Sequence, residues 1–127
     1  MKIVCLDADT LGNDVDLDAV FGKFGEFVSY NMTEANQTVQ RLQNADIVLT
    51  NKVLITKDVI AQTNLKLICV TATGVNNIDL EAAKEANIPV KNVGSGYRMC
   101  RRPQYKPLRS YRILFRFGIE RKLHWIG

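Results

Sequence analysis

Short apolar segments alternate with segments of helical periodicity along the first three quarters of the chain, and this alternation restricts the folds it can adopt. Apolar runs rich in β-branched residues are typical of buried strands, and they occur at residues 2–6, 27–30, 46–50, 66–71 and 88–93. Between them, apolar residues recur at helical spacing at residues 16–24, 33–44, 57–62 and 79–86. Strands joined through helices pair in parallel and are covered on both faces. The sequence therefore predicts an α/β fold, a flavodoxin-like parallel sheet with helices on both faces.

Residues with capping or stop character mark the ends of the predicted helices. Gly25 ends the first helix, Thr33 is placed to cap the second, and Asn44 is placed to end it. Asn77 and Asp79 are candidate caps of the last helix. A length of 127 residues with 46% apolar content is enough for one hydrophobic core.

The charge of the chain is divided unevenly between two segments. Residues 1–97 carry eight basic and twelve acidic side chains, whereas residues 98–127 carry nine basic and one acidic side chain. The formal net charge of +4 is thus the sum of −4 in residues 1–97 and +8 in residues 98–127, so the excess positive charge lies in the tail alone. We accordingly expect one domain over 1–97, followed at 98–127 by a basic, irregular C-terminal tail.

Neither a membrane protein nor a disulfide scaffold is indicated. No apolar run approaches the ~18 residues that span a bilayer, and Met1 leads directly into a predicted strand, so a cytoplasmic protein is expected. Cys5 and Cys69 lie within apolar strand patterns, and Cys100 stands alone in the tail. We expect reduced thiols with no role in metal binding.

The segment from Leu65 to Val93 carries most of the functional information. It reads LKLICVTATGVNNIDLEAAKEANIPVKNV: a strand, a loop of small residues, a helix and a second strand. The loop contains Gly74, where a backbone without a side chain can approach a ligand closely. In an open parallel sheet such a loop lies at the carboxyl ends of the strands, where small ligands bind.

Four groups of residues in this segment, at 65–68, 73–74, 77–80 and 88–93, resemble the substrate-binding domain of NAD-dependent D-isomer-specific 2-hydroxyacid dehydrogenases. The resemblance is to the glycerate dehydrogenase or hydroxypyruvate reductase type, and it extends from Met1 to about Tyr97. It implies a fragment of an oxidoreductase that uses NAD to reduce a small 2-keto acid such as hydroxypyruvate to a 2-hydroxy acid. It also implies that the intact protein is a homodimer.

The resemblance further implies which residues contact the substrate. Backbone N–H groups of the loop that contains Thr73, Gly74 and Val75 would bind the substrate carboxylate, and Lys52 would add positive charge from the neighbouring loop. Two simpler interpretations stay open. Gly74 would then only permit a turn, and Lys52 would be a solvated surface lysine.

The resemblance places the catalytic Arg, Glu and His of the family in or just after a nucleotide-binding domain, which residues 1–97 do not include. The one histidine, His124, lies in the tail. Gly94-Ser95-Gly96 follows a predicted strand, but Met99 stands where a dinucleotide fingerprint requires glycine. We therefore expect this chain alone neither to bind NAD nor to catalyse the reaction.

The tail departs from the family pattern after Gly96-Tyr97. The family continues with a helix that begins Val-Ala-x-His, and codons for residues 98–108 read one base later permit Val-Ala-Ala-His. We hypothesise that the tail is translated out of frame. A basic arm that binds nucleic acid, with Arg109, Arg112 and Arg116 beside aromatic residues, is the alternative. It is disfavoured because two prolines interrupt the segment and no recognition motif is present.

One further motif suggests a different enzyme class. Asp7 and Asp9 follow the first predicted strand as Asp-x-Asp-Thr-Leu, which is similar to the nucleophile loop of haloacid-dehalogenase-type phosphatases. The usual glycine is missing, so Thr10 is displaced by one position. A phosphatase fragment that uses Asp7 and Asp9 is therefore kept as the alternative function.

Overall fold

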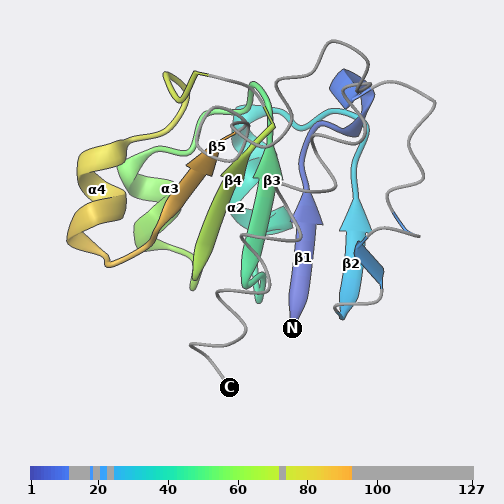
Figure 1. The fold of residues 1–127 in the computed structure, drawn as a ribbon, viewed down its shortest axis with the longest axis horizontal. Coiled ribbons are helices and arrows are strands. Elements are labelled where there is room, and N and C mark those ends of the chain that lie inside the picture. The colour runs from blue at the N-terminus through green and yellow to red at the C-terminus, as the bar shows by residue number, and fades with distance from the viewer. Residues whose placement is uncertain (12–17, 19–20, 23–24, 72–73, 93–127) are drawn as a thin grey trace, which may run out of the picture.

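The computed structural model describes residues 1–11, 18, 21–22, 25–71 and 74–92. Its five parallel strands are β1 (Lys2–Cys5), β2 (Glu26–Ser29), β3 (Ile47–Thr50), β4 (Leu67–Val70) and β5 (Val90–Asn92). They lie in the order β2-β1-β3-β4-β5, and their carboxyl ends all meet at one edge of the sheet (Figure 1). This strand order is that of the flavodoxin-like fold. The predicted fold class is confirmed.

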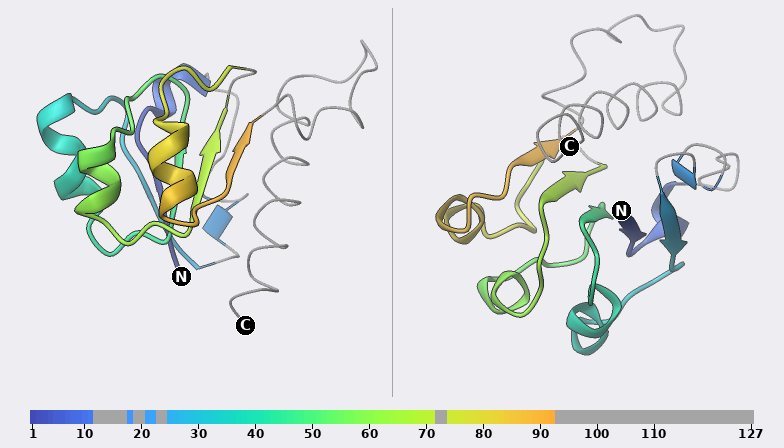
Figure 2. Two further views of the ribbon diagram at one scale, coloured as in Figure 1. Left: turned by 90° about the vertical axis from the view of Figure 1, so that its left-hand side faces the viewer. Right: turned by 90° about the horizontal axis from the view of Figure 1, so that it is seen from below.

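One face of the sheet is covered by three helices: α2 (Thr38–Arg41), which continues the 3-10 turn η3 (Ala35–Gln37), α3 (Lys57–Ala61) and α4 (Leu80–Glu85). Figure 2 shows all three on the same side of the strands. Val4, Val48 and Ile68 point to this face and are fully buried in its core. Period-2 alternation sends Ile3, Ile47 and Leu67 to the opposite face, where they form a second core.

Phe21 packs on the second core. Its backbone is helical, as predicted for residues 16–24, and its ring stacks on Phe27 with 5.3 Å between centroids. Most of that predicted helix lies outside the described residues. Gly25, predicted to end it, has φ +148°, and a Cβ at this position would lie 2.4 Å from the carbonyl oxygen of Met1.

Of the two candidate caps of the last helix, Asp79 is confirmed, whereas the side-chain amide of Asn77 donates to the carbonyl of Val53. Asp79 accepts a hydrogen bond from the N–H of Ala82 at 3.0 Å and begins α4. Asn44, predicted to end a helix, has φ 63°. The prediction for Thr33 is wrong, because its hydroxyl donates to the carbonyl of Leu6 at 2.7 Å and Glu34 is the cap of η3. The carbonyl that accepts from Thr33 is distant in sequence, so a prediction from neighbouring residues could not identify it.

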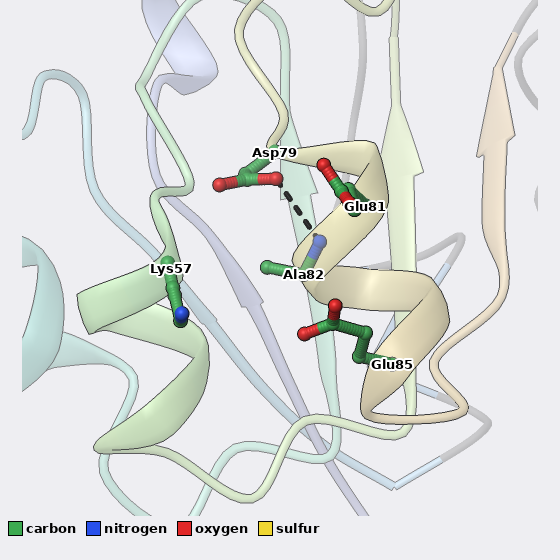
Figure 3. A pocket seen from close by; sticks show the side chains of 5 residues that line it. All are labelled: Lys57, Asp79, Glu81, Ala82 and Glu85. Atoms are coloured by element: carbon green, nitrogen blue, oxygen red, sulfur yellow. Dashed lines mark hydrogen bonds between the residues drawn. The ribbon is translucent and has the colours of Figure 1, made fainter.

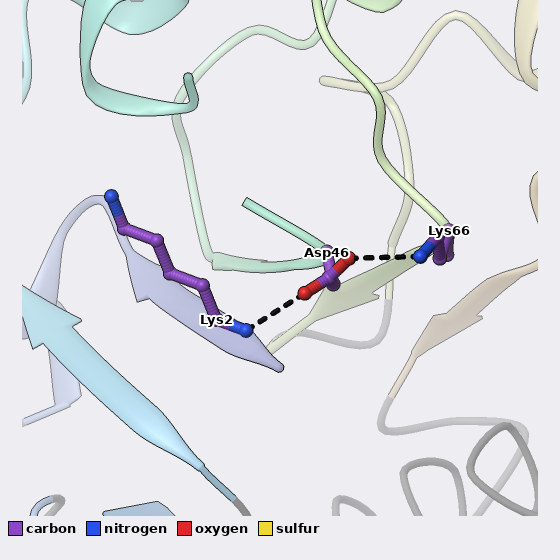
Figure 4. A network of polar contacts seen from close by, with 3 residues as sticks. All are labelled: Lys2, Asp46 and Lys66. Carbon is purple, nitrogen blue, oxygen red and sulfur yellow. Dashed lines mark hydrogen bonds and ion pairs between the residues drawn. The ribbon is translucent and has the colours of Figure 1, made fainter. Parts of the chain in front are cut away.

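Asp46 joins three strands at the amino edge of the sheet (Figure 4). Its carboxylate accepts from the N–H of Lys2 at 2.8 Å and pairs with the ammonium of Lys66 at 3.1 Å. Burial alone would raise the pKa of the Asp46 carboxyl, but the Lys2 N–H and the Lys66 charge outweigh it and hold that pKa below its usual value. The ionised carboxylate therefore stabilises the folded chain.

Candidate functional site

The loops that follow β3 and β4 lie side by side at the carboxyl edge of the sheet and are joined to each other. Ile55 and Ile78 form a parallel bridge. The Ile55 N–H donates to the carbonyl of Asn77 at 2.8 Å, and the Ile55 carbonyl accepts from the Asp79 N–H at 3.0 Å. The side-chain amide of Asn77 also donates to the carbonyl of Val53 at 2.9 Å. The two loops that contain the predicted substrate contacts, Lys52 on one and Gly74 on the other, therefore form one unit.

Gly74 is exposed, and its backbone does not have the positive φ that would demand glycine. A Cβ built at Gly74 would meet no atom of the described residues within 4 Å, apart from its chain neighbours. The turn therefore does not require glycine here, which weakens the interpretation that Gly74 only permits a turn. Thr73 lies outside the described residues.

The backbone N–H groups of Gly74 and Val75 donate none of the hydrogen bonds found among the described residues. Val75 is half-buried and packs against the core on the helical face, so its backbone is held in place by its side chain. Two unused donors on a fixed turn are suited to an anion.

Lys52 has an exposed side chain that forms no ion pair with any residue in the described part of the chain. Its backbone is fixed, because its N–H donates to the carboxylate of Asp7 at 2.7 Å. The structure thus places a cation on the loop that is bridged to the loop of Gly74.

Asp7 and Asp9, the residues of the alternative phosphatase site, do not form a common site. The Asp7 carboxylate is 2% exposed and accepts hydrogen bonds from the N–H groups of Asn51 and Lys52 and from the Thr50 hydroxyl. Asp9 is exposed in the 3-10 turn η1 (Ala8–Leu11), and its N–H donates to the carbonyl of Asn31. A carboxylate whose oxygens are engaged by backbone donors is poorly placed to attack phosphorus.

Cys5 and Cys69 are both buried in the second core. Burial raises the pKa of each thiol to about 12; for Cys5, a hydrogen bond with the Asp7 backbone lowers the pKa and the Asp7 charge raises it, both by less than burial does. Neither thiol is therefore a nucleophile at neutral pH.

Thr71 is a residue that sequence reasoning missed. It directly follows β4, its N–H donates to the carbonyl of Thr50 at 2.9 Å, and it is 2% exposed. Within the described ranges its hydroxyl is a buried side-chain group without a hydrogen-bond partner. Such groups lower stability, and native proteins contain only a few of them.

A hollow of about 170 Å³ lies between α3 and α4 (Figure 3). Lys57 faces Asp79, Glu81 and Glu85 across it, with Ala82 between them. Lys52, Gly74 and Val75, the predicted substrate contacts within the described residues, do not line this hollow, so they are separate from it. Among the described helices, none is long and apolar enough to cross a membrane.

A protein-family model matches most of this chain. The model for the catalytic domain of D-isomer specific 2-hydroxyacid dehydrogenases matches residues 9–98. This range contains both loops of the candidate site.

Three curated proteins are similar in sequence. A Haemophilus influenzae protein that carries the name of a 2-hydroxyacid dehydrogenase is 40% identical over 83% of this chain and 33% of its own length. Hydroxypyruvate reductase of Blautia hydrogenotrophica is 39% identical over 73% of this chain and 30% of its own length. Glycerate dehydrogenase of Methylorubrum extorquens is 38% identical over 72% of this chain and 29% of its own length. The chain thus spans about a third of the length of these relatives.

Solved structures are similar in fold over the same region. NAD-dependent formate dehydrogenase from Staphylococcus aureus in complex with NAD has a TM-score of 0.61 at 27% identity, over 73% of this chain and 31% of that one. The 3-phosphoglycerate dehydrogenase of Entamoeba histolytica with bound NAD+ has a TM-score of 0.61 at 25% sequence identity. The match covers 73% of this chain and 32% of that one.

Proposed function

The chain belongs to the D-isomer specific 2-hydroxyacid dehydrogenase family, and from this premise we propose that residues 1–97 bind the carboxylate of a small 2-keto or 2-hydroxy acid. The intact enzyme would be an NAD-dependent oxidoreductase that reduces a 2-keto acid such as hydroxypyruvate. The names of two relatives, hydroxypyruvate reductase and glycerate dehydrogenase, support this choice of substrate.

The observation that carries the proposal is that the N–H groups of Gly74 and Val75 donate to no acceptor in the described part of the chain, on a loop bridged to that of Lys52. The N–H groups would donate to the carboxylate, and the Lys52 ammonium would balance its charge. Thr73 would complete the loop. Two hydrogen bonds to a charged group, at about 1.5–3 kcal/mol each, correspond to a dissociation constant in about the millimolar range.

The nicotinamide cofactor is not assigned to the described residues. No strand-to-helix turn in residues 1–11, 18, 21–22, 25–71 and 74–92 carries the closely spaced glycines that a pyrophosphate requires. NAD, when bound to the intact enzyme, supplies the hydride that reduces the keto group. Under this proposal the 127-residue chain alone holds one wall of the cleft and does not oxidise NADH with hydroxypyruvate or glyoxylate.

Three further parts of the proposal concern the whole protein. The intact enzyme would be a cytoplasmic homodimer, residues 98–127 would stay outside the substrate-binding domain, and nucleic acid would not be a partner. The tail lies outside the described residues.

Titration of the 15N-labelled chain with D-glycerate, followed by amide NMR, tests the carboxylate site. Glycerol is the matched neutral probe, because it replaces the carboxylate with a hydroxymethyl group. We expect the Gly74 and Val75 amide signals to move with D-glycerate and to stay in place with glycerol. Equal shifts with both probes, or shifts confined to other residues, would contradict the proposed function.

A further inference from the structure

We propose that Asp7 is a positioning residue for Lys52 and that it acts on the anion site without touching the anion. This inference rests on the proposed function, because it assigns a role within the same site. It also gives a function to the acidic motif at the end of β1, which the dehydrogenase resemblance left without one.

The contacts of Asp7 hold the whole turn that follows β3. Its Oδ2 accepts from Lys52 N–H at 2.7 Å and from Asn51 N–H at 3.0 Å, and the Thr50 hydroxyl donates to the same oxygen at 3.3 Å. The Thr50 oxygen in turn accepts from Val53 N–H at 3.1 Å. Three successive N–H groups, from Asn51 to Val53, are thus held directly or indirectly by Asp7.

The carboxylate is suited to this task and an amide is not. All of its neighbours on this turn are donors, and an ionised carboxylate is purely an acceptor, whereas an asparagine would turn an N–H₂ group toward some of them. Hydrogen bonds to an ionised acceptor are also stronger than those between neutral groups. At 2% exposure, Asp7 does not present its charge to an anion in solvent.

The place of this contact in the fold explains why it bears on a ligand. β1 and β3 are neighbours, while β2 lies on the other side of β1, so the chain changes direction across the sheet between β1 and β3. In open α/β sheets, ligands bind outside the carboxyl ends of the strands at such a switch point. Asp7 follows β1 and Lys52 follows β3, so the pair spans this point.

Because the backbone of Lys52 is already fixed, this residue loses less conformational entropy when its ammonium binds an anion. A lysine on a loose turn must lose backbone and side-chain freedom together, whereas here the backbone is already ordered. The engaged N–H of Lys52 also leaves only its ammonium free to meet an anion. Asp7 should therefore affect binding only when the lysine ammonium is present.

A double-mutant cycle on the full chain tests this dependence, with D-glycerate as the probe and amide NMR as the readout. Lys52→Met should weaken binding by a few-fold, about fivefold at most, as for other exposed ion pairs. Asp7→Asn should weaken it by a similar factor, and the double variant should bind like Lys52→Met alone. A purely structural role of Asp7 would instead multiply the two losses, and that result would overturn the inference.

Thr50→Val gives a second, milder variant if Asp7→Asn does not fold. It removes the hydroxyl that links Asp7 to Val53 N–H and keeps the Asp7 carboxylate. We expect about a twofold weaker affinity with Lys52 present and no change in the Lys52→Met background. An equal loss in both backgrounds would overturn the inference.

The failure of this inference is distinguishable from the failure of the proposed function. If the wild-type chain responds equally to D-glycerate and glycerol, the proposed function fails. If the wild-type chain binds D-glycerate but Asp7→Asn, or Lys52→Met, leaves the affinity unchanged, the carboxylate site stands and the role of Asp7 is refuted.

Discussion

Replacement of Gly74 by alanine should change stability and anion binding in opposite directions. Apart from its chain neighbours, a methyl group at Gly74 has no atom of the described residues within 4 Å, and the backbone there has no positive φ, so the described part of the fold can accept it without strain. The same methyl group would stand beside the N–H groups of Gly74 and Val75, where we place the substrate carboxylate. The variant therefore distinguishes a requirement for glycine in folding from a requirement for glycine in anion binding.

The two effects can be estimated from the structure. Alanine restricts the unfolded chain more than glycine does, so Gly74→Ala should raise the free energy of unfolding by about 0.4–1 kcal/mol. Loss of one hydrogen bond to a charged group should lower the binding free energy by about 1.5–3 kcal/mol. That loss corresponds to an affinity for D-glycerate that is weaker by about tenfold or more.

Urea denaturation measures the first effect and amide NMR titration the second. Gly22→Ala is the matched control, because Gly22 also has open space around its missing Cβ and no positive φ. We expect Gly22→Ala to show a comparable gain in stability with unchanged affinity. The reasoning is refuted if Gly74→Ala binds D-glycerate as tightly as the wild-type chain, or if it is destabilised.

Three other variants test contacts that the structure shows. Asp46→Asn should lower the free energy of unfolding by about 1–2 kcal/mol at pH 7. The pKa of Asp46 is lower in the folded chain than in the unfolded chain. The wild-type chain should therefore exceed Asp46→Asn in free energy of unfolding by the full amount at neutral pH, and this difference should disappear as the pH falls through the folded pKa. Urea denaturation at several pH values measures the difference. Thr71→Val should raise the melting temperature, since it removes a buried hydroxyl without a partner at a gain of about 1 kcal/mol, whereas Thr71→Ser should not. Asn77→Ala should lower the free energy of unfolding by about 1 kcal/mol through loss of the contact with the Val53 carbonyl, and Asn76→Ala, at an exposed neighbour, should leave it unchanged.

The sheet was largely predictable because the pattern that indicates each strand lies within a few neighbouring residues. Each strand is a short apolar run, and caps such as Asp79 sit beside the helices that they begin, so neighbouring residues carried the information. The family resemblance drawn from residues 65–93 is confirmed by the match over residues 9–98. The error at Thr33 arose because its hydrogen-bond acceptor, the Leu6 carbonyl, is 27 positions away in sequence.

The candidate site was predictable only in part, for the same reason. A Gly-containing loop after a strand is a local pattern, and it indicated Gly74 and Val75. The role of Asp7 is not local, because its donors at Asn51 and Lys52 reach it only once β1 and β3 are paired. From sequence alone, the motif around Asp7 suggested only a phosphatase nucleophile as an alternative function.

The two carboxylates at opposite ends of the β1–β3 ladder have a consequence for how the chain folds. Lys2 meets Asp46 and Asn51 meets Asp7 across 44 positions of sequence, so the central ladder closes only after a long stretch of chain has been ordered. Such distant pairing makes folding slow, on about the millisecond-to-second scale. A slip of one residue, roughly 3.3 Å, would pull both aspartates off their donors and turn every inward side chain outward. The β1–β3 register should therefore form slowly, and once formed it is stabilised by the Asp46 contact at one end and the Asp7 contacts at the other.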